Sequence, residues 1–312
     1  MTHTNRALRI HDYGGAETPQ IDLVPMPAPG AGQALVRVRA AGVNGLDWKL
    51  RDGLLRNDFP LPLPATLGVE LAGEIVGLGP DVEGFAVGDR VMSFLAGIGA
   101  YADFAVVDAA KLAHVPDGMD FVTAAATPVS GLAAAQGLAA AGGVRAGQRV
   151  LIHGAGGAVG GVMAQMAKAA GAKVIAVGSA ASRQALLDLG VDQVIDRHAE
   201  RFEDVAGPVD LVVDLVSGEA VDRSWAVLAP DGLLLSAATP DIAARAPAGR
   251  RALWFRTLPD RAQLEAVAQD VARGRLKVTL DAVVGMDGLA AAIERNKTGH
   301  GPGKTVVDMS RG

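Results

Sequence analysis

The sequence predicts an α/β fold in which helices cover both faces of a parallel β-sheet. From about residue 121, near-continuous apolar strands alternate with helices, which is the pattern of such a sheet. A glycine-rich loop joins one of these strands to a helix, whereas residues 1–120 have the pattern of short strands and turns. With 312 residues, the chain is long enough for two domains.

The composition excludes several classes of protein. Half of the residues are apolar and 20% are charged, which is too apolar for a disordered chain. The chain has no cysteine, and this excludes disulfides, thiolate zinc sites, iron–sulfur clusters and cysteine nucleophiles. A formal charge of −5 gives no electrostatic reason to expect nucleic acid or an anionic membrane as a partner. Any redox chemistry therefore needs a cofactor.

Two stretches bear on location. The start MTHTNRALRIHDYGG lacks the basic and then apolar layout of a signal peptide, so we expect a cytoplasmic protein. Residues 121–144 contain no charged side chain and are long enough to span a bilayer. They are mostly Ala and Gly and include Pro128, Ser130 and Gln136, so we expect a buried helix there and no membrane span.

The elements follow in order along the chain. The runs at 33–43 and 71–95 are punctuated by Gly and Pro and are expected to be strands of an irregular β-rich domain. Residues 149–179, RVLIHGAGGAVGGVMAQMAKAAGAKVIAVGS, form a predicted βαβ unit. Further helices are expected at 182–190, 218–229 and 260–274, and further strands at 192–196, 209–216, 232–238, 252–258, 278–285 and 303–309.

The glycine loop at 154–160 contains the pattern G-x-G-x-x-G with Ala at its first position. Glycines at these places permit a tight turn, close approach of a pyrophosphate to the backbone, and close packing of helix on strand. Because the loop lies in a complete βαβ unit, a Rossmann dinucleotide-binding domain is favoured over a merely tight turn. The residues expected to bind the cofactor here are Ala155, Gly156, Gly157, Ala158, Val159 and Gly160.

The end of the second strand indicates which cofactor binds. An NAD site usually has an acidic residue there, whereas this chain has Gly178 and Ser179. Lys168 and Arg183 lie nearby in the sequence and could accept a 2′-phosphate. The alternative is that both are solvated helix residues. We therefore expect NADPH in preference to NADH.

Several segments, taken together, resemble the zinc-free branch of the medium-chain dehydrogenase/reductase superfamily that holds quinone oxidoreductases and alkenal or enone reductases. They include AAGVNGLDWKLRDG at 40–53, AAATPVSGLAAAQGL at 124–138 and GHGPGKTVV at 299–307. The resemblance implies a GroES-like catalytic domain, residues 1–120 and 256–312, joined to a doubly wound Rossmann domain, residues 121–255. It also implies a homodimer, and cofactor contacts from Asn44, Val216, Ser236, Trp254 and Lys304.

The resemblance also bears on metal. Zinc-dependent relatives have G-V-C-x-x-D where this chain has residues 42–47, and G-H-E where it has residues 68–70. The cysteine and histidine ligands are replaced by Asn44 and Val69, so we expect no metal. Without a Lewis acid, reduction of a conjugated system is better suited to the site than reversible oxidation of an alcohol.

Three residues are candidates for catalysis. By the resemblance, Asn44 lies beside the nicotinamide, where its amide could donate to a substrate carbonyl; the alternative is a loop residue closing a turn. Tyr101 is a candidate donor, although packing is favoured for it, and Lys49 with Trp48 either lines the cleft or caps it. Ala133 and Trp254 depart from the residues common in the family.

The function expected is transfer of hydride from NADPH to a small molecule, either a quinone or the C=C bond of an α,β-unsaturated carbonyl. The alternative is a catalytically silent NADPH-binding protein with a redox-sensing or structural role. A short-chain reductase needs Y-x-x-x-K, and neither Tyr13 nor Tyr101 is followed by that lysine. That class is therefore excluded.

Overall fold

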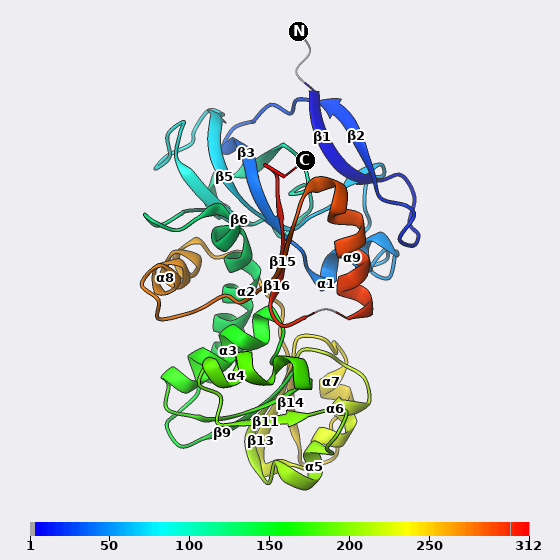
Figure 1. The fold of residues 1–312 in the computed structure, drawn as a ribbon, viewed down its shortest axis with the longest axis vertical. Coiled ribbons are helices and arrows are strands. Elements are labelled where there is room, and N and C mark those ends of the chain that lie inside the picture. Colours follow the sequence, from blue (N-terminus) through cyan, green and yellow to red (C-terminus); the bar gives the residue numbers. More distant parts are fainter. Residues whose placement is uncertain (1–3, 300, 312) are drawn as a thin grey trace.

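The computed structural model describes residues 4–299 and 301–311, which form a β-rich domain and a parallel-sheet domain (Figure 1). Strands from residues 4–114 and 280–308 build the first domain, and strands from residues 149–254 build the second. The predicted combination of a Rossmann sheet with a GroES-like domain is confirmed.

The first domain contains two sheets. A small antiparallel sheet has the order β2-β1-β4, and a larger sheet has the order β15-β16-β3-β5-β6-β8, with β7 paired to β3. Because β16 pairs with β3, the last strand of the chain lies next to one of the first. The strands are β1 (Thr4–Ile10), β2 (Gln20–Pro25), β3 (Gln33–Gly42), β4 (Ala65–Thr66), β5 (Glu70–Leu78), β6 (Arg90–Phe94), β7 (Phe104–Asp108), β8 (Leu112–His114), β15 (Leu280–Val284) and β16 (Lys304–Asp308).

The second domain is a parallel sheet of six strands in the order β11-β10-β9-β12-β13-β14. The order reverses between β9 and β12, and in such sheets ligands bind beyond the carboxyl ends of the strands at this point. Val150, Leu151 and Ile152 of β9 are fully buried, since helices cover both faces. The strands are β9 (Arg149–His153), β10 (Lys173–Gly178), β11 (Gln193–Asp196), β12 (Val209–Asp214), β13 (Leu228–Ser236) and β14 (Arg251–Trp254).

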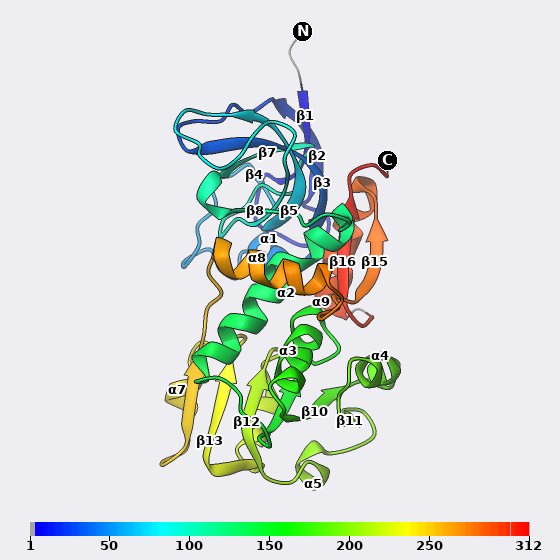
Figure 2. The ribbon, with the colours of Figure 1, turned by 90° about the vertical axis from the view of Figure 1, so that its left-hand side faces the viewer.

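Helix α2 (Phe121–Ala140) connects the two domains. It is the buried helix that the sequence predicts, and it packs against α3 of the second domain and against β3 and β5 of the first. Figure 2 shows α2 running down from the first domain beside the parallel sheet, with α8 packed alongside it. Among the described residues, no helix has the length and apolar content needed to cross a membrane.

The remaining described helices have between 4 and 12 residues. The helix expected at 218–229 ends at Ser224, because Val227 and Leu228 are buried in the core of the sheet and Leu228 begins β13. Burial in the sheet thus overrides the helical pattern at that end. The other helices are α1 (Gly45–Arg51), α3 (Ala158–Ala169), α4 (Arg183–Asp188), α5 (Phe202–Val205), α6 (Glu219–Ser224), α7 (Ile242–Arg245), α8 (Arg261–Ala272) and α9 (Leu289–Thr298), with 3₁₀ turns at Ala109–Lys111, Ala180–Ser182 and Met286–Gly288.

Candidate functional site

The glycine loop has the geometry of a phosphate-binding turn. Gly154 has φ of +78°, so the chain leaves β9 through a conformation that favours glycine, and α3 begins after Gly157. A Cβ atom on Gly160 would lie 2.4 Å from the carbonyl oxygen of Gly154, so only glycine lets the helix pack this closely. A Cβ atom on Gly157 would have only one neighbour within 4 Å, at 3.4 Å. The loop therefore leaves open the side on which a phosphate approaches the amides of α3.

A pocket of about 320 Å³ lies at the carboxyl ends of the parallel strands. Val216, which was predicted to bind the cofactor, lines it together with Gly154 of the glycine loop, while the basic side chains come from positions that sequence reasoning missed. The sequence contained a signal for two of them. A basic pair directly follows β11, much as Gly178 and Ser179 lie at the end of β10. Because the carboxyl ends of parallel strands lie at the same edge of a sheet, this pair could have been predicted to lie near Gly178 and Ser179. The missed residues are Arg197, His198 and Arg223.

Only some of the residues predicted to bind a 2′-phosphate lie together in the structure. Ser179 directly follows β10, and its backbone N–H donates to the hydroxyl of Ser182 at 3.1 Å. Arg183 is exposed at the start of α4, and one of its guanidinium nitrogens donates to the carbonyl oxygen of Val194 at 3.1 Å. Gly178, Ser179 and Arg183 thus lie at the carboxyl edge of the sheet.

Lys168 does not lie there, and this part of the prediction is wrong. Its ammonium group pairs with Asp192 at 2.7 Å, and the carboxylate of Asp192 accepts from the backbone N–H of Val174. Val174 is the second residue of β10, so Lys168 lies at the amino end of the strand, roughly 13 Å along it from Gly178. Helix α3 begins at the glycine loop and Lys168 lies near its other end, so Lys168 is at the opposite edge of the sheet.

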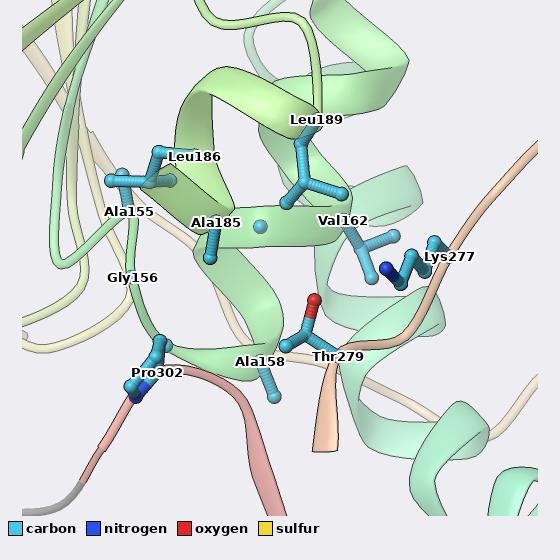
Figure 3. A pocket seen from close by; sticks show the side chains of 12 residues that line it. Ala155, Gly156, Ala158, Val162, Ala185, Leu186, Leu189, Lys277, Thr279 and Pro302 are labelled. Atoms are coloured by element: carbon cyan, nitrogen blue, oxygen red, sulfur yellow. The ribbon is translucent and has the colours of Figure 1, made fainter. Parts of the chain in front are cut away.

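The C-terminal segment of the first domain touches the glycine loop. The backbone N–H of Gly303 donates to the carbonyl oxygen of Gly156 at 2.8 Å. Figure 3 shows Pro302 beside Gly156, at one side of a small pocket that is lined on another side by Leu186 of α4 and by Leu189, which directly follows α4. The segment that leads into β16 therefore links the loop of one domain to the sheet of the other.

A buried polar cluster lies where β3, β5 and β16 meet helix α2. The ammonium group of Lys304 donates to Asn44 Oδ1 at 2.5 Å and is also hydrogen-bonded to Glu70 Oε1. Glu70 is fully buried; its Oε1 accepts from Asn44 Nδ2 at 2.9 Å and its Oε2 from the backbone N–H of Val129 at 2.7 Å. Asn44, Glu70, Lys304 and Val129 N–H are called the polar cluster below.

The cluster changes the role expected for Asn44. Its amide nitrogen donates to Glu70 and to the carbonyl oxygen of Gly42, and its amide oxygen accepts from Lys304. All of these contacts are within the protein, so the amide is not free to donate to a substrate in this structure. Asn44 is instead placed to orient the ammonium group of Lys304.

Tyr101 is fully buried, so a direct donation from it to substrate is contradicted. Its hydroxyl lies 2.7 Å from Asp47 Oδ2 and 3.1 Å from the carbonyl oxygen of Gly42. Burial raises the pKa of Tyr101 well above its ordinary value, and the neighbouring Asp47 raises it further. Burial also raises the pKa of Asp47 to about 7, although Tyr101, the Asn44 N–H and Lys304 act in the opposite direction. Tyr101 is thus a packing residue beside Gly42 and Asp47, as the alternative interpretation expected.

The other predicted residues lie around the two domains. Lys49 is half-buried on α1, with its ammonium 5.6 Å from the centre of the Trp48 ring, at the end of α1 that Asn44 begins. Ser236 ends β13 fully buried, and its hydroxyl donates to Asp214 at 2.6 Å, so this hydroxyl is engaged within the protein. Trp254 ends the neighbouring strand β14 and is 39% exposed.

His153 ends β9 beside the glycine loop. It is buried 2.8 Å from the hydroxyl of Ser224, and burial lowers its pKa to about 4. This buried, neutral imidazole is a strand residue and is not placed to act as an acid or base.

The donor set does not fit a zinc ion. Within residues 4–299 and 301–311, no group of three or more His, Asp or Glu side chains is placed to hold a metal. The oxygens of Asn44 and Glu70 surround an ammonium group instead, and Val69 offers no ligand atom. A nicotinamide dinucleotide, which the fold implies, does fit, because the glycine loop leaves the cradle that a pyrophosphate needs.

Two parts of the chain match families of known proteins. Residues 30–117 match the alcohol dehydrogenase GroES-like domain family, and residues 189–307 match the zinc-binding dehydrogenase family. A quinone oxidoreductase of Pseudomonas aeruginosa is 36% identical over 241 residues, which are 74% of this chain and 72% of that protein. Erythronolide synthase EryA2 of Saccharopolyspora erythraea is 39% identical over 223 residues, 68% of this chain. The chain spans only 6% of that synthase and 11% of a second polyketide synthase protein from Streptomyces orinoci.

Solved structures agree with these relatives. The quinone oxidoreductase from Coxiella burnetii matches with a TM-score of 0.91 and 29% identity, covering 98% of this chain and 100% of that one. The CurK enoyl reductase matches with a TM-score of 0.88 and 26% identity, covering 98% and 99% of the two chains.

Proposed function

Because this chain belongs to the quinone oxidoreductase branch of the medium-chain dehydrogenase/reductase superfamily, we propose that it transfers hydride from NADPH to a quinone or to the C=C bond of an α,β-unsaturated carbonyl. A nicotinamide cofactor is typical of this family. NADPH, and a conjugated small molecule as its partner, are the specific part of the proposal.

One observation carries the proposal. The backbone of Gly303 bonds the glycine loop, and the next residue, Lys304, bonds the polar cluster. The loop suited to a dinucleotide and the cluster of polar groups with its buried cation are therefore contacted by two consecutive residues of the chain. This arrangement supports a reaction between a bound dinucleotide and a substrate at the domain boundary.

Residues of the second domain would hold the cofactor. The amides at the start of α3, from Gly157 onward, would face the pyrophosphate, and the pocket at the strand ends has the size and basic lining for a phosphorylated adenosine. Arg183 begins α4 shortly after Ser179, and the backbone N–H of Arg197 donates to the carbonyl oxygen of Gly178 at 2.9 Å. These two arginines are the residues that we propose for the 2′-phosphate.

The choice of acceptor rests on chemistry. The relatives are named as quinone oxidoreductases and, in one case, as an enoyl reductase. Both reactions put negative charge on an oxygen that is conjugated to the carbon that is reduced, and a buried cation stabilises this charge. The polar cluster offers such a cation, so a conjugated acceptor is favoured over a simple alcohol.

The test of the proposal is a panel of quinones and enones, with NADPH consumption followed at its absorbance. Turnover with at least one class supports the oxidoreductase. Tight binding of NADPH without turnover on any acceptor would instead support the silent NADPH-binding protein.

Cofactor preference gives a first prediction. We expect NADPH to bind at least ~10-fold more tightly than NADH, equivalent to about 1.4 kcal/mol. Arg183→Ala and Arg197→Ala should weaken NADPH binding while NADH binding stays unchanged, and Lys168→Ala serves as the control because Lys168 pairs with Asp192 at the other edge of the sheet. The measurement is the dissociation constant of each cofactor by calorimetry. Equal constants in the wild-type protein would contradict the preference.

Asn44→Ala gives a second prediction. The change removes an acceptor from Lys304 and a donor from Glu70. We expect turnover to fall by about 10- to 100-fold, because the cation loses its fixed direction, with little change in NADPH affinity. The assay compares turnover per folded molecule, NADPH affinity and melting temperature. A variant that loses only thermal stability would show that Asn44 is a turn residue.

A homodimer is part of the same proposal. Strand β14 is the last strand of its sheet, and Leu253 and Trp254 on it are 38% and 39% exposed. An edge strand with exposed apolar side chains is suited to pairing with a second chain.

A further inference from the structure

We propose that the imidazole of His153 recognises the adenine base of the dinucleotide, with its Nδ1 atom accepting a hydrogen bond from the 6-amino group. This inference rests on the proposed function, which puts the adenosine in the pocket at the strand ends. It assigns the residue that distinguishes adenine from hypoxanthine. The proposed reaction gives His153 no other role.

His153 lies at the centre of the carboxyl edge of the parallel sheet. It ends β9, and its partners in the sheet are Val177 of β10 and Asp214 of β12. The strand order reverses between β9 and β12, and His153 lines the pocket of about 320 Å³ at this edge. The next residue, Gly154, begins the glycine loop, so a base in this pocket is close to the turn that suits its phosphates.

The hydrogen bonds of Ser224 fix the position of the proton on the imidazole. The Ser224 hydroxyl lies 2.6 Å from the carbonyl oxygen of Ala220, which can only accept, so the hydroxyl donates its one proton there. His153 Nε2 lies 2.8 Å from the same hydroxyl oxygen, and this oxygen can then only accept from it. The proton of the neutral ring is therefore on Nε2, and Nδ1 is its acceptor.

The Nδ1 atom is available to a ligand. Within residues 4–299 and 301–311, no hydrogen-bond partner of this atom is described. The enclosed side-chain atoms without a partner in this part of the chain belong to Arg9, Asp47, Arg51 and Ser130. Because Nδ1 of His153 is not among them, it is open to the pocket that its residue lines.

The ring is neutral and held in one orientation. Burial lowers the pKa of His153 to about 4, so the imidazole carries no charge near neutral pH. Its ring stands edge-on to that of Phe202, with the ring centres 4.7 Å apart and the planes at 76°. Together with the bond to Ser224, this contact fixes the direction in which Nδ1 accepts.

An acceptor in this position selects among bases. Adenine has an amino group at position 6, which donates, whereas hypoxanthine has an oxygen there, which accepts. Two facing acceptors share no proton, so hypoxanthine would leave both atoms unpaired away from water. The rest of the lining suits a flat base, since Val177, Val216 and Ala220 are apolar.

The pairing of His153 with Ser224 does not make a nucleophile and its base. Ser224 is fully buried, and its proton is donated to Ala220. The nearby carboxylate of Asp214 is already engaged by two backbone N–H groups and two hydroxyls. The one unused polar atom of the pair is Nδ1 of His153, and it can only accept.

The first test compares the dissociation constants of NADPH and of reduced nicotinamide hypoxanthine dinucleotide phosphate by calorimetry. The wild type should bind NADPH at least ~10-fold more tightly, because a buried acceptor that loses its donor costs this much. In His153→Phe the two constants should lie within about twofold of each other, since a phenyl ring keeps the contact with Phe202 but has no acceptor. The melting temperature shows whether the variant is folded.

Two further variants complete the comparison. His153→Gln carries an amide N–H for Ser224 and an amide oxygen for the base, so it should keep a preference for NADPH of at least ~3-fold. Lys168→Met is the matched control, because Lys168 pairs with Asp192 at the other edge of the sheet, and its preference should equal that of the wild type.

The second test uses nitrogen NMR of the histidine rings. The chain has six histidines, and the signals of His153 are those that disappear in His153→Phe. They should show the proton on Nε2 and a ring that is mainly neutral at about pH 5, since its pKa is about 4. The Nδ1 signal should shift when 5′-AMP is added and stay in place with 5′-IMP.

The outcomes separate this inference from the proposed function. Equal affinity of the wild type for the two dinucleotides, or an unchanged preference in folded His153→Phe, would overturn the assignment. Binding of neither dinucleotide, or a proton on Nδ1, would overturn it as well. A base preference that depends on His153, in a protein that reduces no quinone or enone, would uphold the assignment and refute the proposed oxidoreductase.

Discussion

Gly160→Ala is expected to lower the free energy of unfolding by about 3 kcal/mol, since overpacking against rigid atoms typically costs this much. The added methyl group would lie 2.4 Å from the carbonyl oxygen of Gly154 and 2.6 Å from the Cα atom of Ala155. Both are backbone atoms of the glycine loop, so α3 has to move away from the loop. Thermal unfolding should show a fall of roughly 6–12 °C, and NADPH binding should be lost with it.

Gly157→Ala is the matched control in the same loop. Its methyl group would have one neighbour, 3.4 Å away, so the fold accepts it. It would project on the side where the pyrophosphate approaches the amides. We expect a melting temperature within ~2 °C of the wild type and NADPH affinity at least ~10-fold weaker. Equal stability of the two variants would show that the loop is not packed as described, and wild-type affinity in Gly157→Ala would place the phosphates elsewhere.

The second large effect is the pH dependence that Asp47 confers. Its pKa is about 7 in the folded protein, against an ordinary value of 3.8, with burial as the main cause. The groups that face it are the Tyr101 hydroxyl and the Asn44 N–H, with the charges of Lys304 and Glu70 nearby. One of its oxygens, Oδ1, is buried without a hydrogen-bond partner among the described residues.

The sign follows from proton binding. Between about pH 4 and pH 7 the unfolded chain loses this proton while the folded protein keeps it, so the free energy of unfolding falls as the pH rises. At about 1.36 kcal/mol per pKa unit, the change amounts to roughly 4 kcal/mol. Asp47→Asn retains an acceptor for Asn44 and Tyr101 but cannot ionise, so it lacks this dependence.

The measurement is urea unfolding of both proteins from pH 4 to pH 8. The stability of the wild type relative to Asp47→Asn should decline through this range and level off above pH 7. Parallel curves would show that Asp47 titrates at its ordinary value.

Local patterns accounted for the second domain well. Each apolar run of β9, β10 and β12 is a contiguous stretch of five or six residues, so its burial on both faces of the sheet can be predicted from neighbouring residues alone. Lys168 shows the limit of this reasoning, because closeness in sequence to the glycine loop is not closeness in space when a helix lies between.

The polar cluster lay beyond sequence reasoning for a different reason. Asn44 and Lys304 are 260 residues apart, and only the pairing of β16 with β3 brings them together. The motifs showed that the metal ligands of relatives are replaced in this chain, but they did not show which groups lie together in place of the metal site. The basic lining of the pocket was within reach, since Arg197 follows a strand end, but no periodicity distinguishes it from a solvated loop residue.

The pairing of β16 with β3 has a consequence for synthesis of the chain on the ribosome. All strands of the parallel sheet are available once residue 254 has emerged from the ribosome. The larger sheet of the first domain cannot be completed until residues 280–308 have been synthesised. Until then Glu70 has no counter-ion, and the site against which Val306 and Val307 are buried stays uncovered. Domains usually fold in the order of their synthesis, but here the domain begun first is finished last. A ribosome that stalls before Lys304 therefore releases a complete parallel-sheet domain attached to an unfinished partner, which is the form that chaperones and proteases would meet.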